Sequence, residues 1–301
     1  MYSYERMKHS VNSWIIATRP WSFPASAMPV IVTIAWLWSV GYDVKWWLGL
    51  LAVVTIVFVH AAGNVWSDIA DYRKGVDAPD VVCTRLLVDK VFTIQEFKRL
   101  SVSLNCVAIV LGLLMVFLTG PVTLYIGIAG ILLSLGYPFL KYKALGDVVI
   151  LLCYGFLPMI GTSYIVTGEI VWNVLWLTMS IGLITLAILH VNNVRDIATD
   201  RRAGIQTFPM LTGAQVGVWM YVFYVLFPFL WLVVIVLLGN VSWWGLVALL
   251  ALPIAITNAR TIIAERNKQW VKSVSLDEKT AQLQLAFGVL LTIGMVLAHF
   301  F

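Results

Sequence analysis

The chain has 301 residues, of which 61% are hydrophobic and only 12% are charged. A soluble domain carries roughly 25% charged residues, so this composition excludes an ordinary soluble protein and indicates one embedded in a lipid bilayer. The formal net charge of +5 would fit nucleic-acid binding in a soluble protein. In a membrane protein it reflects basic loops on one side, and we expect no nucleic-acid partner.

Long apolar segments follow one another along the chain. Each is about 20 residues long, which a helix needs to cross about 30 Å of hydrocarbon. The alternating pattern of barrel strands is absent. The sequence therefore predicts an all-α integral membrane protein with nine transmembrane helices in one bundle and a single domain over 1–301. The predicted spans are 22–40, 46–66, 100–118, 121–137, 147–167, 171–191, 214–238, 243–264 and 281–300.

The loops between these spans differ in charge. If the N-terminus is cytoplasmic, the cytoplasmic segments and the adjoining ends of the spans hold all but one of the 20 Lys and Arg residues, the exception being Lys45. Positive residues concentrate in cytoplasmic loops. We therefore expect a cytoplasmic N-terminus and a multi-pass protein of the cell (plasma) membrane.

Two matched acidic motifs lie where a predicted span meets the cytoplasmic side. One runs from Asn64 to Gly75 and the other from Asn192 to Gly204, and both read Asn-x-x-x-Asp-Ile-Ala, then Asp-x-Arg-x-Gly. Ionisable groups at membrane depth are costly and usually functional, so this duplication favours a site over interfacial carboxylates paired with nearby bases. Helical spacing puts the polar side chains of each motif on one face: Asn64, Asp68 and Asp71 in the first, and Asn192, Asp196 and Asp200 in the second.

The chemistry of these side chains indicates a metal and an anionic ligand. Carboxylate and amide oxygens without a His or Cys cluster select a hard cation, for which Mg²⁺ is the natural choice. Two such clusters near basic residues suit a diphosphate, whose growing charge the metal would neutralise as the diphosphate leaves. An anionic head at the membrane surface with an apolar tail among helices describes a polyprenyl diphosphate. Four basic side chains could add charge-assisted contacts: Arg85, Lys141, Lys143 and Arg195.

Several stretches together resemble the UbiA-type intramembrane aromatic prenyltransferases over nearly the full chain. The second motif and Lys-Gly-x-Asp in the first look most like the branch that prenylates 1,4-dihydroxy-2-naphthoate for menaquinone synthesis. The segment after Asp77 lacks the Gly-rich character common in that branch, and Ser67 stands where the family's first motif has Asn. Asn64, nearly one turn earlier, could supply the missing amide oxygen. The resemblance is carried by Arg19-Pro20, Ser67 to Asp77, Tyr137 to Lys141, Gly146-Asp147 and Asn192 to Gly204.

The resemblance implies that Mg²⁺ binds between the two motifs and holds the diphosphate of a polyprenyl diphosphate. Ionisation would give an allylic cation in a pocket closed to water, and an aromatic acceptor would attack it. Asp68 and Asp196 would be the central metal ligands. The other implied ligands, or residues that support them, are Asn64, Asp71, Asn192 and Asp200, and the implied catalytic set is Asp68, Asp71, Asp196 and Asp200.

Other residues carry weaker expectations. Asp77 is expected in the loop after the first motif, and Asp147 could hold a basic partner, help with the acceptor or serve the structure. His60 and His190 could line the cavity or act on the acceptor, although a hydrogen-bonded helix histidine is the commoner case. The polar segment 265–280 is interpreted as a solvated loop, with the charged residues Glu265, Arg266, Lys268, Lys272, Asp277, Glu278 and Lys279.

Three alternatives compete with this interpretation. A secondary transporter also combines repeated halves with polar sites, but its site typically lies near the membrane midplane. A prenyltransferase acting on hydroxybenzoate, homogentisate or a lipid alcohol would share the same motifs. A CDP-alcohol phosphotransferase would need a DG-x-x-AR signature, which this chain lacks.

Overall fold

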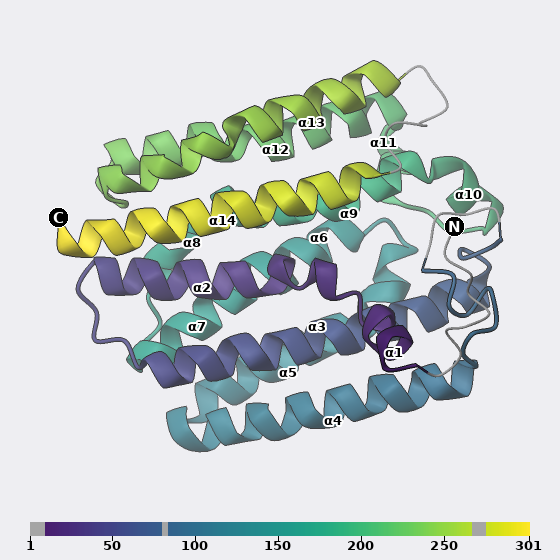
Figure 1. Ribbon diagram of the computed structural model, residues 1–301, viewed down its shortest axis with the longest axis horizontal. Helices are drawn as coiled ribbons and strands as arrows, with labels where there is room; N and C mark the ends of the chain where they lie inside the picture. Colours follow the sequence, from purple (N-terminus) through teal and green to yellow (C-terminus); the bar gives the residue numbers. More distant parts are fainter. Residues whose placement is uncertain (1–9, 80–83, 267–274) are drawn as a thin grey trace.

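The computed structural model describes residues 10–79, 84–266 and 275–301. Within these ranges nine helical segments are long and apolar enough to cross a membrane. Figure 1 shows the long helices side by side along the length of the molecule. The predicted all-α architecture and number of spans are confirmed, whereas the membrane orientation and the single domain stay predictions.

The spans have the following bounds. The first is Pro20–Ser39, made of η2 (Pro20–Ser22) and α2 (Pro24–Ser39), followed by α3 (Trp46–Lys74), α4 (Ile94–Thr119) and α5 (Pro121–Lys141). The fifth joins α6 (Gly146–Leu151), η3 (Leu152–Phe156) and α7 (Leu157–Thr167). The sixth joins η4 (Trp172–Val174), α8 (Leu175–Leu177), η5 (Thr178–Gly182) and α9 (Leu183–Arg195). The last three are α12 (Ala214–Leu237), η6 (Trp243–Ala251) with α13 (Leu252–Glu265), and α14 (Leu276–Phe300).

Both acidic motifs lie at the same end of the bundle, which we call the motif end and define by Asn64–Gly75 and Asn192–Gly204. Three short helices, α1 (Val11–Ala17), α10 (Ile197–Arg202) and α11 (Phe208–Thr212), also lie there (Figure 1). Local signals define the helix ends that border the first motif. Gly75 closes α3 in the left-handed conformation, at φ 77°, and Thr93 opens α4 with a capping box to Glu96.

Several helices extend further into polar sequence than expected. α3 continues from the predicted end at 66 to Lys74, so the whole first motif is helical. α5 continues from the predicted end at 137 through Pro138 to Lys141. An apolar run marks only the part of a helix that lies in hydrocarbon, and polar turns can follow it without a break in backbone hydrogen bonding.

The N-terminus of α14 corrects the interpretation of 265–280 as a solvated loop. The helix begins at Leu276, five residues before the predicted start, and Asp277 and Glu278 lie in its first turn. Glu265 is buried, with 2% of its surface exposed. Lys268 and Lys272 lie outside the described residues.

Two pairs of spans approach closely at glycines. The fifth and sixth spans both contain a π-helical segment, η3 and η5, and an added Cβ on Gly182 would lie 3.4 Å from the Cα of Gly155. α14 meets η6 at Gly294, where an added Cβ would meet the Trp244 backbone and lie 3.1 Å from the Cα of Gly245. Backbone atoms cannot yield as a flexible side chain can, so these positions restrict side-chain size.

We expect Gly294→Ala to destabilise the bundle by about 1–3 kcal/mol, the usual cost of overpacking. Its thermal unfolding midpoint in detergent should fall by several degrees. Gly136→Ala is a matched control in another transmembrane helix, because the new Cβ would meet only the flexible end of Leu140, at 3.6 Å. Equal midpoints for the two variants would contradict the close contact at Gly294.

Candidate active site

A cavity of about 880 Å³ opens between the two acidic motifs. Its lining at the motif end is polar, and its walls further along the helices are largely apolar. The motif residues that line it are Asn64, Ser67, Asp71, Asn192, Asp196 and Asp200. The structure therefore brings both motifs to one space.

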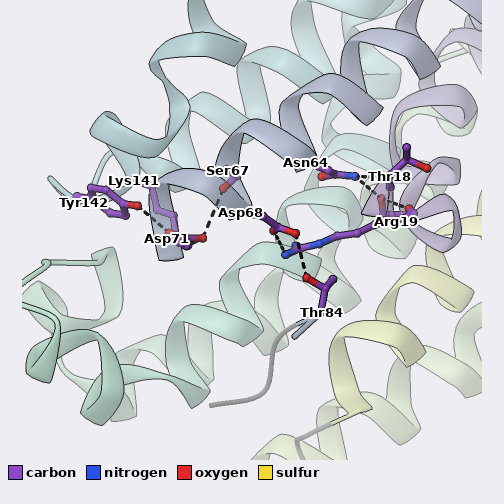
Figure 2. A network of polar contacts seen from close by, with 10 residues as sticks. Thr18, Arg19, Asn64, Ser67, Asp68, Asp71, Thr84, Lys141 and Tyr142 are labelled. Atoms are coloured by element: carbon purple, nitrogen blue, oxygen red, sulfur yellow. Dashed lines mark hydrogen bonds and ion pairs between the residues drawn. The ribbon is translucent and has the colours of Figure 1, made fainter. Parts of the chain in front are cut away.

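Asp68 lies behind this lining and is held by two partners. Its side chain is almost fully buried, at 1% exposure. Arg19 forms an ion pair with one carboxylate oxygen, and the Thr84 hydroxyl donates to the other at 2.9 Å (Figure 2). Arg19 and Thr84 themselves line the cavity. Arg19 and Thr84 therefore separate the carboxylate of Asp68 from the cavity.

Asp71 is the acidic centre of the first motif inside the cavity. Lys141 Nζ lies 3.3 Å from one of its oxygens, and the Tyr142 hydroxyl donates to the other at 2.8 Å. Ser67 donates weakly to the same carboxylate, at 3.5 Å. Figure 2 shows these side chains converging on Asp71. The Ser67 that departs from the family motif therefore supports its neighbour one turn later.

Asn64 points toward the chain segment that enters α2. Its amide nitrogen donates to the carbonyl of Thr18 at 3.0 Å and to the Ser22 hydroxyl at 3.1 Å (Figure 2). Because these two hydrogen bonds use the amide nitrogen, the amide oxygen is the atom through which Asn64 could bind a ligand.

The second motif has a parallel arrangement around a break in the helix. α9 ends at Arg195 and α10 begins at Ile197. The Arg195 guanidinium makes two hydrogen bonds of 2.7 Å to Asp196. It also lies 4.0 Å from Asp277 of α14. The amide oxygen of Asn192 is buried without a hydrogen-bond partner among the described residues, so a polar atom of this motif is open to a ligand.

Two carboxyl groups near the motifs have raised pKa values. Burial raises the pKa of Asp200 to about 7, against the lowering effect of Lys141, and the nearby carboxylates of Asp196 and Asp71 add to the rise. Burial also raises the pKa of Asp77 to about 7, with Asp68 and Asp71 adding to it. Lys141 thus lies within electrostatic reach of both motifs.

Besides Asp68, four of the predicted site residues lie away from the cavity lining: Arg85, Lys143, Asp147 and His190. Arg85 makes two hydrogen bonds to Asp89, at 3.0 and 2.6 Å, and one to the carbonyl of Pro79. The side chain of Lys143 is exposed, and its backbone forms an isolated bridge with Gln206.

Asp147 and His190 form a separate buried pair. His190 Nδ1 lies 2.6 Å from Asp147, and Nε2 lies 2.9 Å from the carbonyl oxygen of Gly217. Asn193 donates to the other Asp147 oxygen at 3.3 Å. This network ties α6, α9 and α12 together, which fits the structural alternative for both residues.

His60 does line the cavity. Its two ring nitrogens lie 2.9 Å from the Ser26 hydroxyl and 3.3 Å from the Ser22 hydroxyl, and Tyr154 lies against its ring. It is thus both hydrogen-bonded and exposed to the cavity, so the two expectations for this residue are compatible.

Five cavity or site residues were not found from the sequence: Arg19, Thr84, Tyr142, Asp277 and Glu278. Arg19 has a signal that could have found it, because a cation directly before the first apolar run must lie near the membrane surface. Asp277 and Glu278 precede the last span on the same side as both motifs. Thr84 and Tyr142 have no such signal, because only the folded loops bring them to the carboxylates.

The donor atoms at the motif end fit a hard cation that shares its coordination with a ligand. Within 10–79, 84–266 and 275–301, no three His, Cys, Asp or Glu side chains come together closely enough to hold a metal ion alone. The motif groups are carboxylate and amide oxygens, and one of them, Asn192 Oδ1, has no hydrogen-bond partner in the described part of the chain. Mg²⁺ typically binds one or two carboxylates together with phosphate oxygens and water, so this oxygen set suits it.

Comparison with known proteins identifies the family. The model of the UbiA prenyltransferase family matches residues 26–276. The UbiA prenyltransferase domain-containing protein 1 of Homo sapiens is 31% identical over 295 residues, which cover 95% of this chain and 84% of that protein.

Solved structures show the same fold at low identity. A digeranylgeranylglyceryl phosphate synthase aligns with a TM-score of 0.62 and 20% identity, over 95% of this chain and 98% of that one. A UbiA homologue from Archaeoglobus fulgidus, bound to GPP and Mg²⁺, aligns with a TM-score of 0.59 and 11% identity, over 93% and 99% of the two chains. With the family match over most of its length and two acidic motifs facing one cavity, this chain belongs to the UbiA prenyltransferase family.

Proposed function

We propose that the protein transfers a prenyl group from a polyprenyl diphosphate to an aromatic acceptor in a Mg²⁺-dependent reaction. The observation that carries this proposal is one cavity with two acidic motifs and the cations Lys141 and Arg195 at its polar end and apolar walls beyond. The polar end suits a diphosphate with its metal, and the apolar part suits an isoprenoid chain. The solved homologue bound to GPP and Mg²⁺ supports the same ligand pair.

Binding of a diphosphate would make the carboxylates at the polar end available to the metal. Lys141 and Arg195 now neutralise Asp71 and Asp196, and both can turn to diphosphate oxygens. Once Lys141 and Arg195 bind the diphosphate, the carboxylate oxygens of Asp71 and Asp196 are free to bind the metal. Bound Mg²⁺ would supply neutralisation of the charge on the departing diphosphate. The residues that would hold it are Asp68, Asp71, Asp196 and Asp200, with the amide oxygens of Asn64 and Asn192.

The cavity walls protect the allylic cation from water. Tyr137, Tyr154 and His60 line the cavity between the polar end and the apolar walls, and aromatic ring faces stabilise cations. We propose 1,4-dihydroxy-2-naphthoate as the acceptor, as an enzyme of menaquinone synthesis would use. The ring carbon that bears the carboxylate would form the new bond to the allylic carbon as the diphosphate leaves, and loss of that carboxylate as carbon dioxide would restore the aromatic ring. The proposed location is the cell membrane, with the motif end on the cytoplasmic side.

A lipid alcohol is the second candidate acceptor. The supporting observation is the similarity in fold to a digeranylgeranylglyceryl phosphate synthase. Hydroxybenzoate and homogentisate complete the panel of acceptors to be tested, because the motif residues act on the donor and leave the acceptor open.

Purified protein should release diphosphate from a prenyl diphosphate only with Mg²⁺ and a suitable acceptor. Asp68→Asn and Asp196→Asn should each lower turnover at least about 100-fold, because transition-state charge stabilisation of this kind contributes that much. Diphosphate release with the acceptor panel is the measurement, and unfolding curves check that the variants fold. No release with any acceptor, or full activity in either variant, would contradict the proposal.

Lys141 and Lys143 offer a matched comparison of two nearby lysines. Lys141→Met should raise the KM for the prenyl diphosphate or lower kcat by about 100-fold in all, because Lys141 lies at Asp71 inside the cavity. Lys143→Met should change either constant by less than about threefold, because Lys143 is exposed outside the cavity lining. Steady-state kinetics on both variants decide this, and equal losses would contradict the assignment of Lys141 to the diphosphate.

Metal affinity should depend on pH near neutrality. The folded-state pKa of Asp77 and of Asp200 is raised from 3.8 to about 7. Ionisation of these groups as the pH rises between 3.8 and about 7 therefore weakens the metal-free fold. Mg²⁺ would require the ionised form of Asp200, a proposed ligand, and would favour the ionised form of Asp77, which lies near Asp68 and Asp71. The apparent Mg²⁺ affinity with a prenyl thiodiphosphate should fall by up to about tenfold per pH unit, for each proton displaced, as the pH drops below about 7.

The Asp77→Asn variant is the control for this titration. Protonation of the diphosphate itself contributes equally in both proteins, so a smaller slope in the variant reports the carboxyl group. An affinity that rises as the pH falls would contradict the raised pKa values.

A further inference from the structure

The cavity continues far beyond the two motifs as an apolar channel. Its lining residues on α3 run from Asp71 to Ala52, a distance of about 28 Å at 1.5 Å per residue. This is close to the about 30 Å thickness of a membrane's hydrocarbon core. The far half is lined by α3, α4, α5 and α7, and we call it the tail channel, defined by Ala52, Gly112, Met115, Gly127, Gly130 and Ile165.

At three glycines of the tail channel, close packing against another helix does not explain why the residue is glycine. A Cβ added to Gly112 of α4, or to Gly127 or Gly130 of α5, would have no side chain or other helix of the described residues within 4 Å, its immediate neighbours in the chain aside. Two other glycines that line the cavity differ from them. A Cβ on Gly63 would lie 3.0 Å from Ser134 Oγ, and one on Gly161 would lie 3.1 Å from Ile126 Cγ2. Close helix contacts therefore explain Gly63 and Gly161 but not the other three.

Glycine within a helix is less stable than alanine, because it loses more conformational freedom on folding. At Gly112, Gly127 and Gly130 no close approach of another helix compensates for this loss. What the absent side chains provide at these positions is free volume within the channel. A ligand whose head lies at the polar end would need this volume for the far part of its chain.

We propose that Gly112, Gly127 and Gly130 keep the tail channel open for the isoprenoid chain of the donor and set the longest chain that the protein accepts. The proposal rests on the proposed function, because it takes the donor's head to lie at Lys141. Measured along α5 from Lys141, Gly130 lies about 16 Å and Gly127 about 21 Å away. A side chain placed at these two positions would close the channel at two different depths.

The test is binding of a series of non-hydrolysable prenyl thiodiphosphates with Mg²⁺ to the full-length protein in nanodiscs. The series is dimethylallyl, geranyl, farnesyl and geranylgeranyl thiodiphosphate, measured by titration calorimetry. The variants are Gly130→Leu and Gly127→Leu, because leucine is a good helix former and has open space at both positions. Gly136→Leu is the matched control on the same helix, since Gly136 is outside the cavity lining.

Gly130→Leu should weaken binding of the two longest compounds by about tenfold or more, as expected for overpacking, and leave dimethylallyl binding within about twofold. Gly127→Leu should begin to lose affinity only at a longer chain than Gly130→Leu. The wild-type protein and Gly136→Leu should share one profile. Equal weakening at every chain length, no change in either channel variant, or the same shift in Gly136→Leu would overturn the proposal.

Turnover measured on the same samples separates this proposal from the proposed function. If the channel variants show this length dependence in binding but the wild-type protein never releases diphosphate, the proposed enzymatic function is rejected and the channel proposal stands. A wild-type protein that turns over, with variants whose chain-length profile is unchanged, would do the reverse. Absence of binding at every chain length would overturn the channel proposal itself.

Discussion

The structure depends on keeping carboxylates and their cations together within a largely apolar bundle. An isolated charge at membrane depth is costly, and a buried charge whose partner is removed is strongly destabilising. Arg19 meets Asp68, Lys141 meets Asp71, and Arg195 meets Asp196. The bases come from the chain before α2, the end of α5 and the end of α9. The first two pairs join residues 49 and 70 apart in sequence, so they also fix how the helices meet at the motif end. Arg195 and Asp196 are adjacent, and Arg195 reaches another helix through Asp277 of α14, at 4.0 Å.

The same pairs prepare the protein for its proposed ligand. A diphosphate with its metal brings both negative and positive charge, so each base can exchange a carboxylate for a phosphate oxygen and each carboxylate can exchange a base for the metal. The local charge stays balanced before and after this exchange, which limits the free energy that binding requires. Asn192 Oδ1, which is buried without a partner in the described part of the chain, would gain one from the proposed ligand.

The sequence predicted the fold and the core of the candidate site well, because both leave periodic signals. Hydrophobic runs located all nine spans, and the repeated spacing of Asn64 to Asp71 and Asn192 to Asp200 located the groups that meet at the cavity. Helix ends were less predictable, because hydropathy stops at the hydrocarbon boundary whereas hydrogen bonding does not. For this reason Asp277 was placed in a loop instead of the first turn of α14.

The partner of each basic residue could not be predicted, because it depends on the three-dimensional course of loops. Arg85 and Lys141 both lie between predicted spans, yet Arg85 bonds to Asp89 in its own loop and Lys141 reaches Asp71, 70 residues away. His60 and His190 differ in the same way, since only His60 lines the cavity. Whether a helical side chain reaches the cavity depends on its direction around the helix axis. A single sequence predicts that direction only where polar residues recur at a regular spacing.

The most direct test of the account is a double-mutant cycle between the two motifs. The measured quantity is the Mg²⁺-dependent affinity for geranyl thiodiphosphate in the wild-type protein, Asp71→Asn, Asp200→Asn and the double variant. If both carboxylates serve one metal–diphosphate site, their effects should be non-additive, with a coupling of at least about 1 kcal/mol. Additive effects within about 0.5 kcal/mol would mean that the two motifs act independently, which would contradict a single shared site.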